Sequence, residues 1–347
     1  MSSARFSWLI AVSLVLFAVF ANTASSHHAL VAFDSSRAVE IRGVIETVFW
    51  KNPHVRLSVR TADGELWDLE GPPVNRMERD NGVRQELFPV GAEVVFTGLP
   101  SRRAELRMRP LLARLSSGQV LVMDRERAER LALLNEIAER PPASSEQVEE
   151  AIRNAEGIFR VWYANGRTPT RPPDVELPLT DAAREETASW IQEEDGLAVR
   201  CIPAGMPEAM MTPFPMEIID QGDTIVVRLE EWDNVRTIDI RGDANRQNQV
   251  ASHLGYSIGR WEDGVLVART TDIDYPFMDD VGTPLSEVAE IVERFEMSED
   301  EMRLDWSATV IDPETFTEPV TLPIVHFEWR PGVQVRPYDC TLYPGRA

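Results

Sequence analysis

The chain has 347 residues, of which 43% are hydrophobic, 27% charged and 8% aromatic, and this composition excludes collagen-like and disordered chains. Its length predicts two domains. The net charge of −22 is concentrated in residues 122–347, which hold 21 basic and 45 acidic side chains, whereas residues 27–121 hold 13 and 12. A surface as acidic as the second half repels phosphate backbones and anionic lipids, so we expect no nucleic-acid partner.

The first 26 residues have the pattern of a signal peptide. Arg5 precedes an apolar run over residues 6–21, and small residues follow at positions 24–26. The apolar run is short for a membrane span. We therefore expect cleavage near Ser26, a periplasmic or secreted protein, and no stable membrane insertion after cleavage.

Residues 27–121 predict a small β domain. Short alternating segments are separated by turn residues such as Asn52-Pro53 and Asp63-Gly64, and one helix is expected over residues 74–80. The expected strands are 39–50, 54–59, 65–69, 93–97 and 106–115. Five short strands with one helix between them favour a barrel of the OB type, and a compact sandwich is the alternative.

Residues 122–156 predict a helical connector between the domains. Apolar residues recur at helical spacing over 123–140, and Pro141-Pro142 ends that helix. Ser144 is a suitable N-cap for a second helix that reaches Ala155.

Residues 157–347 predict a second, larger β domain. Nine strands alternate with tight turns, and one helix over 181–194 follows Thr180 as its N-cap. The expected strands are 158–163, 217–219, 224–232, 235–240, 255–261, 265–271, 288–297, 302–311 and 324–329. A meander of this length usually closes and so removes its edges, which favours an up-and-down antiparallel barrel that resembles the lipocalin group.

The mature chain contains only two cysteines, Cys201 and Cys340. Export places them in an oxidising compartment, where pairing is the default. We predict one disulfide that closes a long loop, which the chain-entropy account values at roughly 5 kcal/mol.

Three histidines predict a metal site. His27 and His28 would begin the mature chain after cleavage at Ser26, and His54 follows Asn52-Pro53. A free α-amine and an imidazole can both be neutral at working pH and can chelate Cu(II) together, so copper is the cofactor candidate. The alternative is a polar N-terminal tail with no ligand.

Aromatic strands of the second domain predict a pocket for a small, partly apolar molecule. Its candidate lining consists of Trp232, Tyr256, Trp261, Trp306, His326 and Trp329. Alternation alone leaves open which barrel face points inward. Four methionines, at positions 206, 210, 211 and 216, are either soft ligands for Cu(I) or, as we favour, an apolar plug.

No strong catalytic motif is present in the sequence. It has no Gly-x-Ser-x-Gly, no His-Glu-x-x-His and no phosphate-binding glycine loop. The first hypothesis is therefore an exported binding protein, the second a copper-handling protein, and the third an enzyme acting on a small molecule in the barrel. The sequence leaves the oligomeric state open.

Two parts of the chain resemble uncharacterised exported bacterial proteins. Residues 27–121 resemble the domain of unknown function 6152 family through Gly43, Trp50-x-Asn52-Pro53-His54 and Trp67. The second half resembles a large secreted group through Arg200-Cys201-x-Pro203-x-Gly205 and Arg236-Thr237-Ile238. Both resemblances imply export and an architecture, and neither implies an activity.

Overall fold

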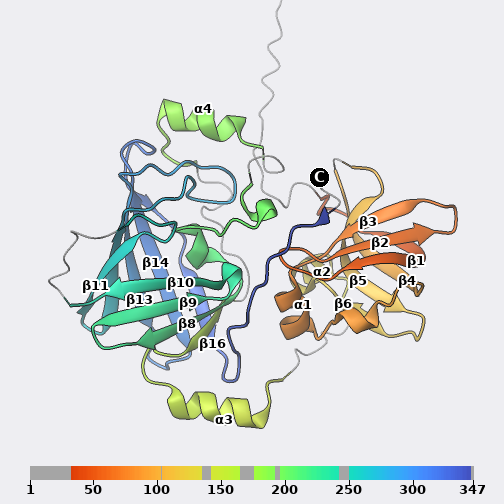
Figure 1. Cartoon of the computed structure of the whole chain (residues 1–347), viewed down its shortest axis with the longest axis horizontal. Helices are drawn as coiled ribbons and strands as arrows, with labels where there is room; N and C mark the ends of the chain where they lie inside the picture. Colours follow the sequence, from red (N-terminus) through yellow and green to blue (C-terminus); the bar gives the residue numbers. More distant parts are fainter. Residues whose placement is uncertain are drawn as a thin grey trace, which may run out of the picture.

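The structure is a computed structural model that describes residues 33–102, 104–134, 142–164, 176–191, 196–241 and 250–344. It is mainly β, with two closed barrels side by side and few helices (Figure 1). The predicted signal peptide, His27 and His28 lie outside the described residues. No helix within the described ranges is long and apolar enough to cross a membrane.

The N-terminal barrel consists of five strands and confirms the predicted OB-like domain. The strands are β1 (Val39–Phe49), β2 (Arg56–Thr61), β3 (Leu66–Glu70), β4 (Glu93–Pro100) and β5 (Arg107–Leu115). Their order in the sheet is β3-β2-β1-β4-β5, and a parallel pairing of β3 with β5 closes the barrel. The predicted helix is α1 (Val74–Asn81), between β3 and β4, and an additional short strand, β6 (Val120–Val122), pairs with β5.

Strands β1 and β2 approach each other closely at Gly43. A Cβ at this position would lie 2.4 Å from the carbonyl oxygen of Arg60 and 2.7 Å from the side chain of Val59. Ile41 and Ile45, on the same face of β1, point into the barrel core. Glycine therefore keeps the alternation of β1 intact where no side chain fits.

We predict that Gly43→Ala lowers the free energy of unfolding by about 1–3 kcal/mol, because the added methyl group overpacks the β1–β2 contact. Urea unfolding followed by tryptophan fluorescence measures the change. Gly71→Ala is the control, since its new Cβ would meet its nearest neighbour, Val55 Cβ, at an ordinary 3.5 Å. Equal losses in both variants would contradict the steric explanation.

Two described helices form the connector. α2 (Arg125–Arg130) begins after Asp124, whose side chain accepts a hydrogen bond from the Arg127 amide. α3 (Ser145–Asn154) begins with the predicted cap, because Ser144 and Gln147 form a capping box. The first predicted helix is shorter than the expected range 123–140, because α2 ends at Arg130 and residues 131–134 are not helical; residues 135–141 lie outside the described part of the chain.

The C-terminal barrel consists of nine strands, as predicted. They are β7 (Val161–Ala164), β8 (Pro215–Asp220), β9 (Thr224–Leu229), β10 (Asn234–Asp239), β11 (Tyr256–Glu262), β12 (Val265–Thr271), β13 (Glu290–Met297), β14 (Arg303–Ile311) and β16 (Val325–Trp329). The strands follow one another around the barrel, and β16 lies between β14 and β7. Every pairing in this ring is antiparallel except that of β10 with β11, which is parallel.

Short segments outside this ring complete the second domain. α4 (Asp181–Ser189) begins after Thr180, whose hydroxyl accepts a hydrogen bond from the Ala183 amide, as expected of the predicted N-cap. β15 (Val320–Thr321) pairs with β14. The sequence did not predict β15, because two residues are too few for a recognisable alternation.

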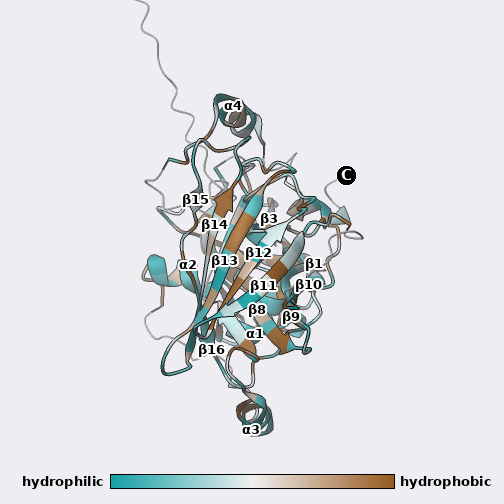
Figure 2. Ribbon diagram, turned by 90° about the vertical axis from the view of Figure 1, so that its left-hand side faces the viewer, coloured by the Kyte–Doolittle hydropathy of each residue, from teal (hydrophilic) through white to brown (hydrophobic). Residues whose placement is uncertain are grey.

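The interior of this barrel is filled by alternate side chains of its strands. Ile225, Val227 and Leu229 of β9 belong to one continuous core with Val325 and Phe327 of β16. Figure 2 shows hydrophobic and hydrophilic residues alternating along β13. The four predicted plug methionines are 0–1% exposed in the same core, which confirms the packing role.

After β16 the chain leaves the barrel and runs to the N-terminal domain (Figure 1). Residues 330–344 are termed the C-terminal strap. Its Cys340 forms a disulfide with Cys201, 139 residues away, and the predicted pairing is therefore confirmed.

Candidate functional site

The six residues predicted to line a pocket are spread over the barrel, with Trp306 in its interior and Tyr256 beside a groove in its wall. Trp306 is fully buried, and its indole Nε1 donates a hydrogen bond to Glu293 (3.0 Å). Tyr256 is the first residue of β11 and lines a groove in the barrel wall. Tyr256 is thus the predicted residue that borders open volume.

The remaining tryptophans do not converge on one cavity. Trp261 is 44% exposed and meets Phe159 edge to face. Trp329 lies 4.4 Å from the guanidinium of Arg160, whereas Trp232 packs on Tyr338 of the strap. Each of these rings covers a different part of the barrel.

His326 lies on the outer face of β16. Its Nδ1 is 2.6 Å from an oxygen of Asp305, the residue directly opposite on β14. The inward-facing residues of this strand are Val325 and Phe327. The face of β16 that carries His326 therefore points outward. A histidine beside a carboxylate is therefore present, on an exposed sheet surface.

A groove of about 450 Å³ lies beside β10, where the barrel wall divides. β10 pairs with β9 along its whole length but with β11 only at Ile238 and Asp239. Val235 and Thr237 therefore line one wall, and the segment that precedes β11 lines the other. The groove lies where β10 and β11 separate, because these two strands pair over only two residues.

Polar groups border this groove and are held in place. His253 Nε2 lies 2.8 Å from Asn234 Oδ1, while Asn234 Nδ2 donates to the carbonyl of Ala204 (3.1 Å). Since Oδ1 only accepts, Nε2 carries the proton when the ring is neutral. Burial lowers the pKa of His253, which keeps the ring neutral near pH 7. Nδ1 is then the unprotonated nitrogen.

Arg236 connects the groove to the barrel interior. Its guanidinium donates to Glu293 Oε1 (2.7 Å) and to the hydroxyls of Ser257 (3.0 Å) and Thr270 (2.7 Å). Glu293 also accepts hydrogen bonds from Thr270 and Trp306. Because all five side chains are at most 2% exposed, this is a buried ion pair with its hydrogen bonds satisfied.

We predict that Glu293→Gln lowers the free energy of unfolding by about 3–5 kcal/mol, because it leaves the buried Arg236 cation without a counter-charge. The double variant Arg236→Met with Glu293→Gln should lose less, since it removes the cation as well. Urea unfolding of both variants measures the difference. A double variant at least as unstable as Glu293→Gln alone would contradict this explanation.

His54 lies beside Glu70 on the N-terminal barrel. Its Nδ1 is 3.2 Å from the carbonyl oxygen of Gly71, and its Nε2 is 3.8 Å from Glu70 Oε1. Desolvation lowers the pKa of the imidazole to about 4, and Arg109 and Arg56 add to this shift against the opposing effect of Glu70. The neutral ring therefore donates from Nδ1 and has its lone pair on Nε2.

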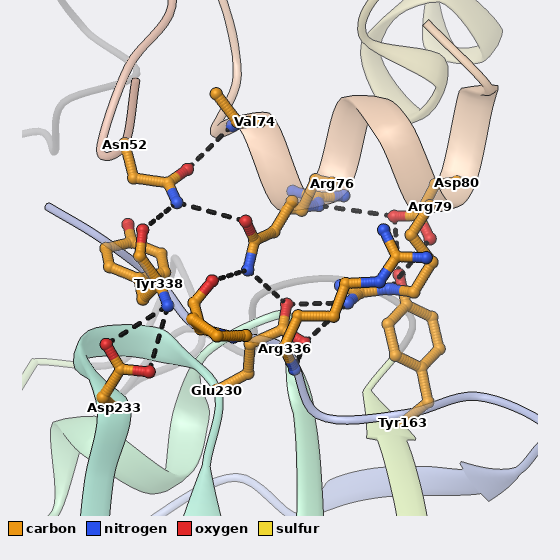
Figure 3. A network of polar contacts seen from close by, with 12 residues as sticks. Asn52, Val74, Arg76, Arg79, Asp80, Tyr163, Glu230, Asp233, Arg336 and Tyr338 are labelled. Atoms are coloured by element: carbon orange, nitrogen blue, oxygen red, sulfur yellow. Dashed lines mark hydrogen bonds and ion pairs between the residues drawn. The ribbon is translucent and has the colours of Figure 1, made fainter. Parts of the chain in front are cut away.

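Asn52, from the segment Trp50-x-Asn52-Pro53-His54, joins the two domains. Its Oδ1 accepts a hydrogen bond from the amide of Val74 at the start of α1 (2.8 Å), and its Nδ2 donates to Asn75 (3.2 Å) and to the carbonyl of Tyr338 (Figure 3). The Asn52 carbonyl accepts from the amide of Thr341 (2.9 Å). The Asn52 side chain thus binds both the start of α1 and the strap, and its backbone carbonyl binds the strap as well.

A comparison with known protein families finds a match for the N-terminal part of the chain. Residues 15–107 match the Family of unknown function (DUF6152). The match supports the resemblance expected of the N-terminal part and ends at the first residue of β5; the N-terminal barrel that contains most of it is called the DUF6152 domain below. No curated protein and no solved structure matches the chain.

The DUF6152 domain binds the second barrel mainly through Glu230, which is fully buried. Arg79 of α1 donates to both Glu230 oxygens (2.6 and 2.8 Å), Asn75 to one of them (3.2 Å), and the amide of Arg336 to the other (2.9 Å) (Figure 3). A second link joins Tyr163 to Asp80 (2.6 Å). The interface therefore consists of charge-assisted hydrogen bonds between α1, the barrel and the strap.

Sequence reasoning gave Arg236 and Glu293 no role in a site, and it named His253, with His326, only as a possible base beside a carboxylate. The alternation of β10 could have identified Arg236 as an inward-facing residue. Asn234, Arg236 and the apolar Ile238 are two residues apart and therefore lie on the same, inner face of the strand. The partner of Arg236, Glu293, lies 57 residues away, and only the closed barrel brings the two together. His253 lies in no predicted strand, and its position depends on the parting of β10 and β11.

Proposed function

We propose that the chain is an exported binding protein whose groove beside β10 holds a small, partly apolar molecule. The observation that carries the proposal is the opening of about 450 Å³ in the wall of a barrel whose interior is filled by its own side chains. This volume lies within the range of ligand sites, which is roughly 300–1,000 Å³. The ligand site thus lies in the barrel wall instead of along its axis.

The lining of the groove defines the chemistry of the ligand. Val235 is 58% exposed and offers an apolar surface. Thr237 and His253 offer hydrogen-bonding groups, and Tyr256 combines a ring with a hydroxyl. Asp239 and Arg241 form an ion pair at the same groove (3.0 Å), which adds a charged edge. We therefore expect a molecule with one apolar face and polar substituents.

We predict that Val235→Trp abolishes ligand binding, because the indole fills the groove from its apolar wall. The measurement is native mass spectrometry of the mature protein purified from the exported fraction, read for a co-purified organic mass. Wild type should carry this mass and Val235→Trp should not.

Ile311→Trp is the matched control. Ile311 is also an exposed strand residue, 36% accessible at the end of β14 and outside the groove. It should retain the bound mass. Loss of the mass in both variants, or retention in both, would contradict a site in this groove.

Copper handling is the second candidate function, and the orientation of His54 favours it. Metal-ligating histidines usually donate their other N–H to a carbonyl or carboxylate, as His54 does toward Gly71. Within the described residues no group of three metal-ligating side chains occurs, so further ligands must come from His27 and His28.

The chain leading to these histidines starts close to His54. The Phe33 ring lies 5.9 Å from the guanidinium of Arg107, Arg107 pairs with Glu70, and Glu70 lies beside His54. Four residues lie between His28 and Phe33, and the five residue-to-residue steps that join them span at most roughly 17 Å. The copper hypothesis therefore requires that this length of chain bridges the distance from Phe33 to His54.

We predict that His54→Ala weakens Cu(II) binding by the mature protein at least about tenfold, because a ligand is lost. Competition against a coloured chelator measures the affinity. His326→Ala is the control, since this histidine is exposed and lies on the other barrel. One extra residue before His27 should also weaken binding, and unchanged affinity in both N-terminal domain variants would end the copper hypothesis.

A further inference from the structure

The last residues of the strap lie on the outer face of the DUF6152 domain. The ring of Tyr343 meets Phe49, the last residue of β1, edge to face with centroids 5.2 Å apart. The guanidinium of Arg56, the first residue of β2, lies 5.3 Å from the centre of the same ring. An aromatic side chain of the chain itself thus occupies a small platform made of one ring and one cation.

The platform is held in place without Tyr343. Arg56 donates to Asp68 (2.6 Å) and forms an ion pair with Glu70 (2.8 Å), both on β3. Phe49 is fixed as part of a paired strand. A ring site that is preformed in this way loses little entropy when it binds a planar group.

We propose that Phe49 and Arg56 form a binding site for a planar aromatic group, that Tyr343 fills this site in the oxidised protein, and that the Cys201–Cys340 disulfide keeps it filled. The site differs from the groove beside β10, which lies in the other barrel. An aromatic ring suits it because Phe49 offers an edge and Arg56 a cation to the face of the same ring.

The strap is held unequally along its length. Near Tyr338 it is anchored by buried groups, since the Arg336 amide binds Glu230 (2.9 Å), the Tyr338 amide binds Asp233 (3.0 Å), and the Tyr338 ring is 1% exposed. Among the described residues beyond Cys340, the Thr341 amide binds the Asn52 carbonyl and the Tyr343 ring meets Phe49 and Arg56. The end of the strap therefore depends on its covalent tether, whereas the middle does not.

Opening of the tether is a two-electron reduction. A dithiol reductant attacks one sulfur of the partly exposed disulfide and resolves the mixed disulfide, so that the reductant becomes a disulfide. Cys201 and Cys340 each gain one proton and one electron and become thiols. The residues after Cys340 are then joined to the molecule through the anchored middle of the strap alone.

Hydrogen exchange at single-residue resolution tests the tether. In the full-length mature protein treated with a dithiol, and in the Cys201→Ser/Cys340→Ser variant without reductant, the Thr341 amide should exchange at least about tenfold faster than in the oxidised protein. The amides of Arg336 and Tyr338 should keep their protection. Unchanged protection at Thr341, or loss at Arg336 and Tyr338 as well, would overturn the proposal.

The dye anilinonaphthalene sulfonate tests the ring site in the oxidised protein. Tyr343→Ala should raise the fluorescence of the dye several-fold over wild type, and Phe49→Ala in the same background should remove the gain. Leu342→Ala is the matched control, because Leu342 is a neighbouring, 58% exposed residue with no ring contact in the described structure. Equal fluorescence of Tyr343→Ala and Leu342→Ala would overturn the site.

Discussion

A single buried carboxylate, that of Glu230, determines how the two barrels and the C-terminal strap fit together. A charge removed from water needs opposite charge and hydrogen bonds, and Glu230 obtains them from Arg79, Asn75 and the Arg336 amide. These three partners come from one helix of the DUF6152 domain and from the strap. Separation of the domains would take Arg79 and Asn75 away from Glu230 and leave that carboxylate with the Arg336 amide, so the loss of these hydrogen bonds opposes a change in the relative orientation of the domains.

The parts of the fold that depend on local pattern could be predicted from the sequence. Alternation and turn residues gave both barrels, and Ser144 and Thr180 marked the starts of two helices. The disulfide followed from a count of two cysteines. The parallel pairing of β10 with β11 could not be predicted, because it depends on how the chain returns to the sheet after β10, and no local residue type records that path.

The candidate site was less predictable than the fold for the same reason. Aromatic residues on strands suggested a pocket, yet Trp306 is packed inside the core and Trp261 lies on the surface. Tyr256 borders the groove because of its place at the start of β11, not because it is aromatic. Inward-facing Arg236 and Glu293 replace apolar volume with a satisfied ion pair across the barrel interior, between two strands that are not neighbours in the sheet.

The strap makes two kinds of contact. Its middle, at Arg336 and Tyr338, is anchored by buried groups, whereas its end, at Tyr343, is the part that we propose reduction releases. Domain movement is opposed by Glu230 and by the link between Tyr163 and Asp80, where burial and the neighbouring carboxylate raise the pKa of the Tyr163 phenol and keep it a donor. A change in the redox environment therefore acts on the residues after Cys340 before it acts on the arrangement of the barrels. The DUF6152 domain can in this way expose a ring site while the groove in the second barrel keeps its shape.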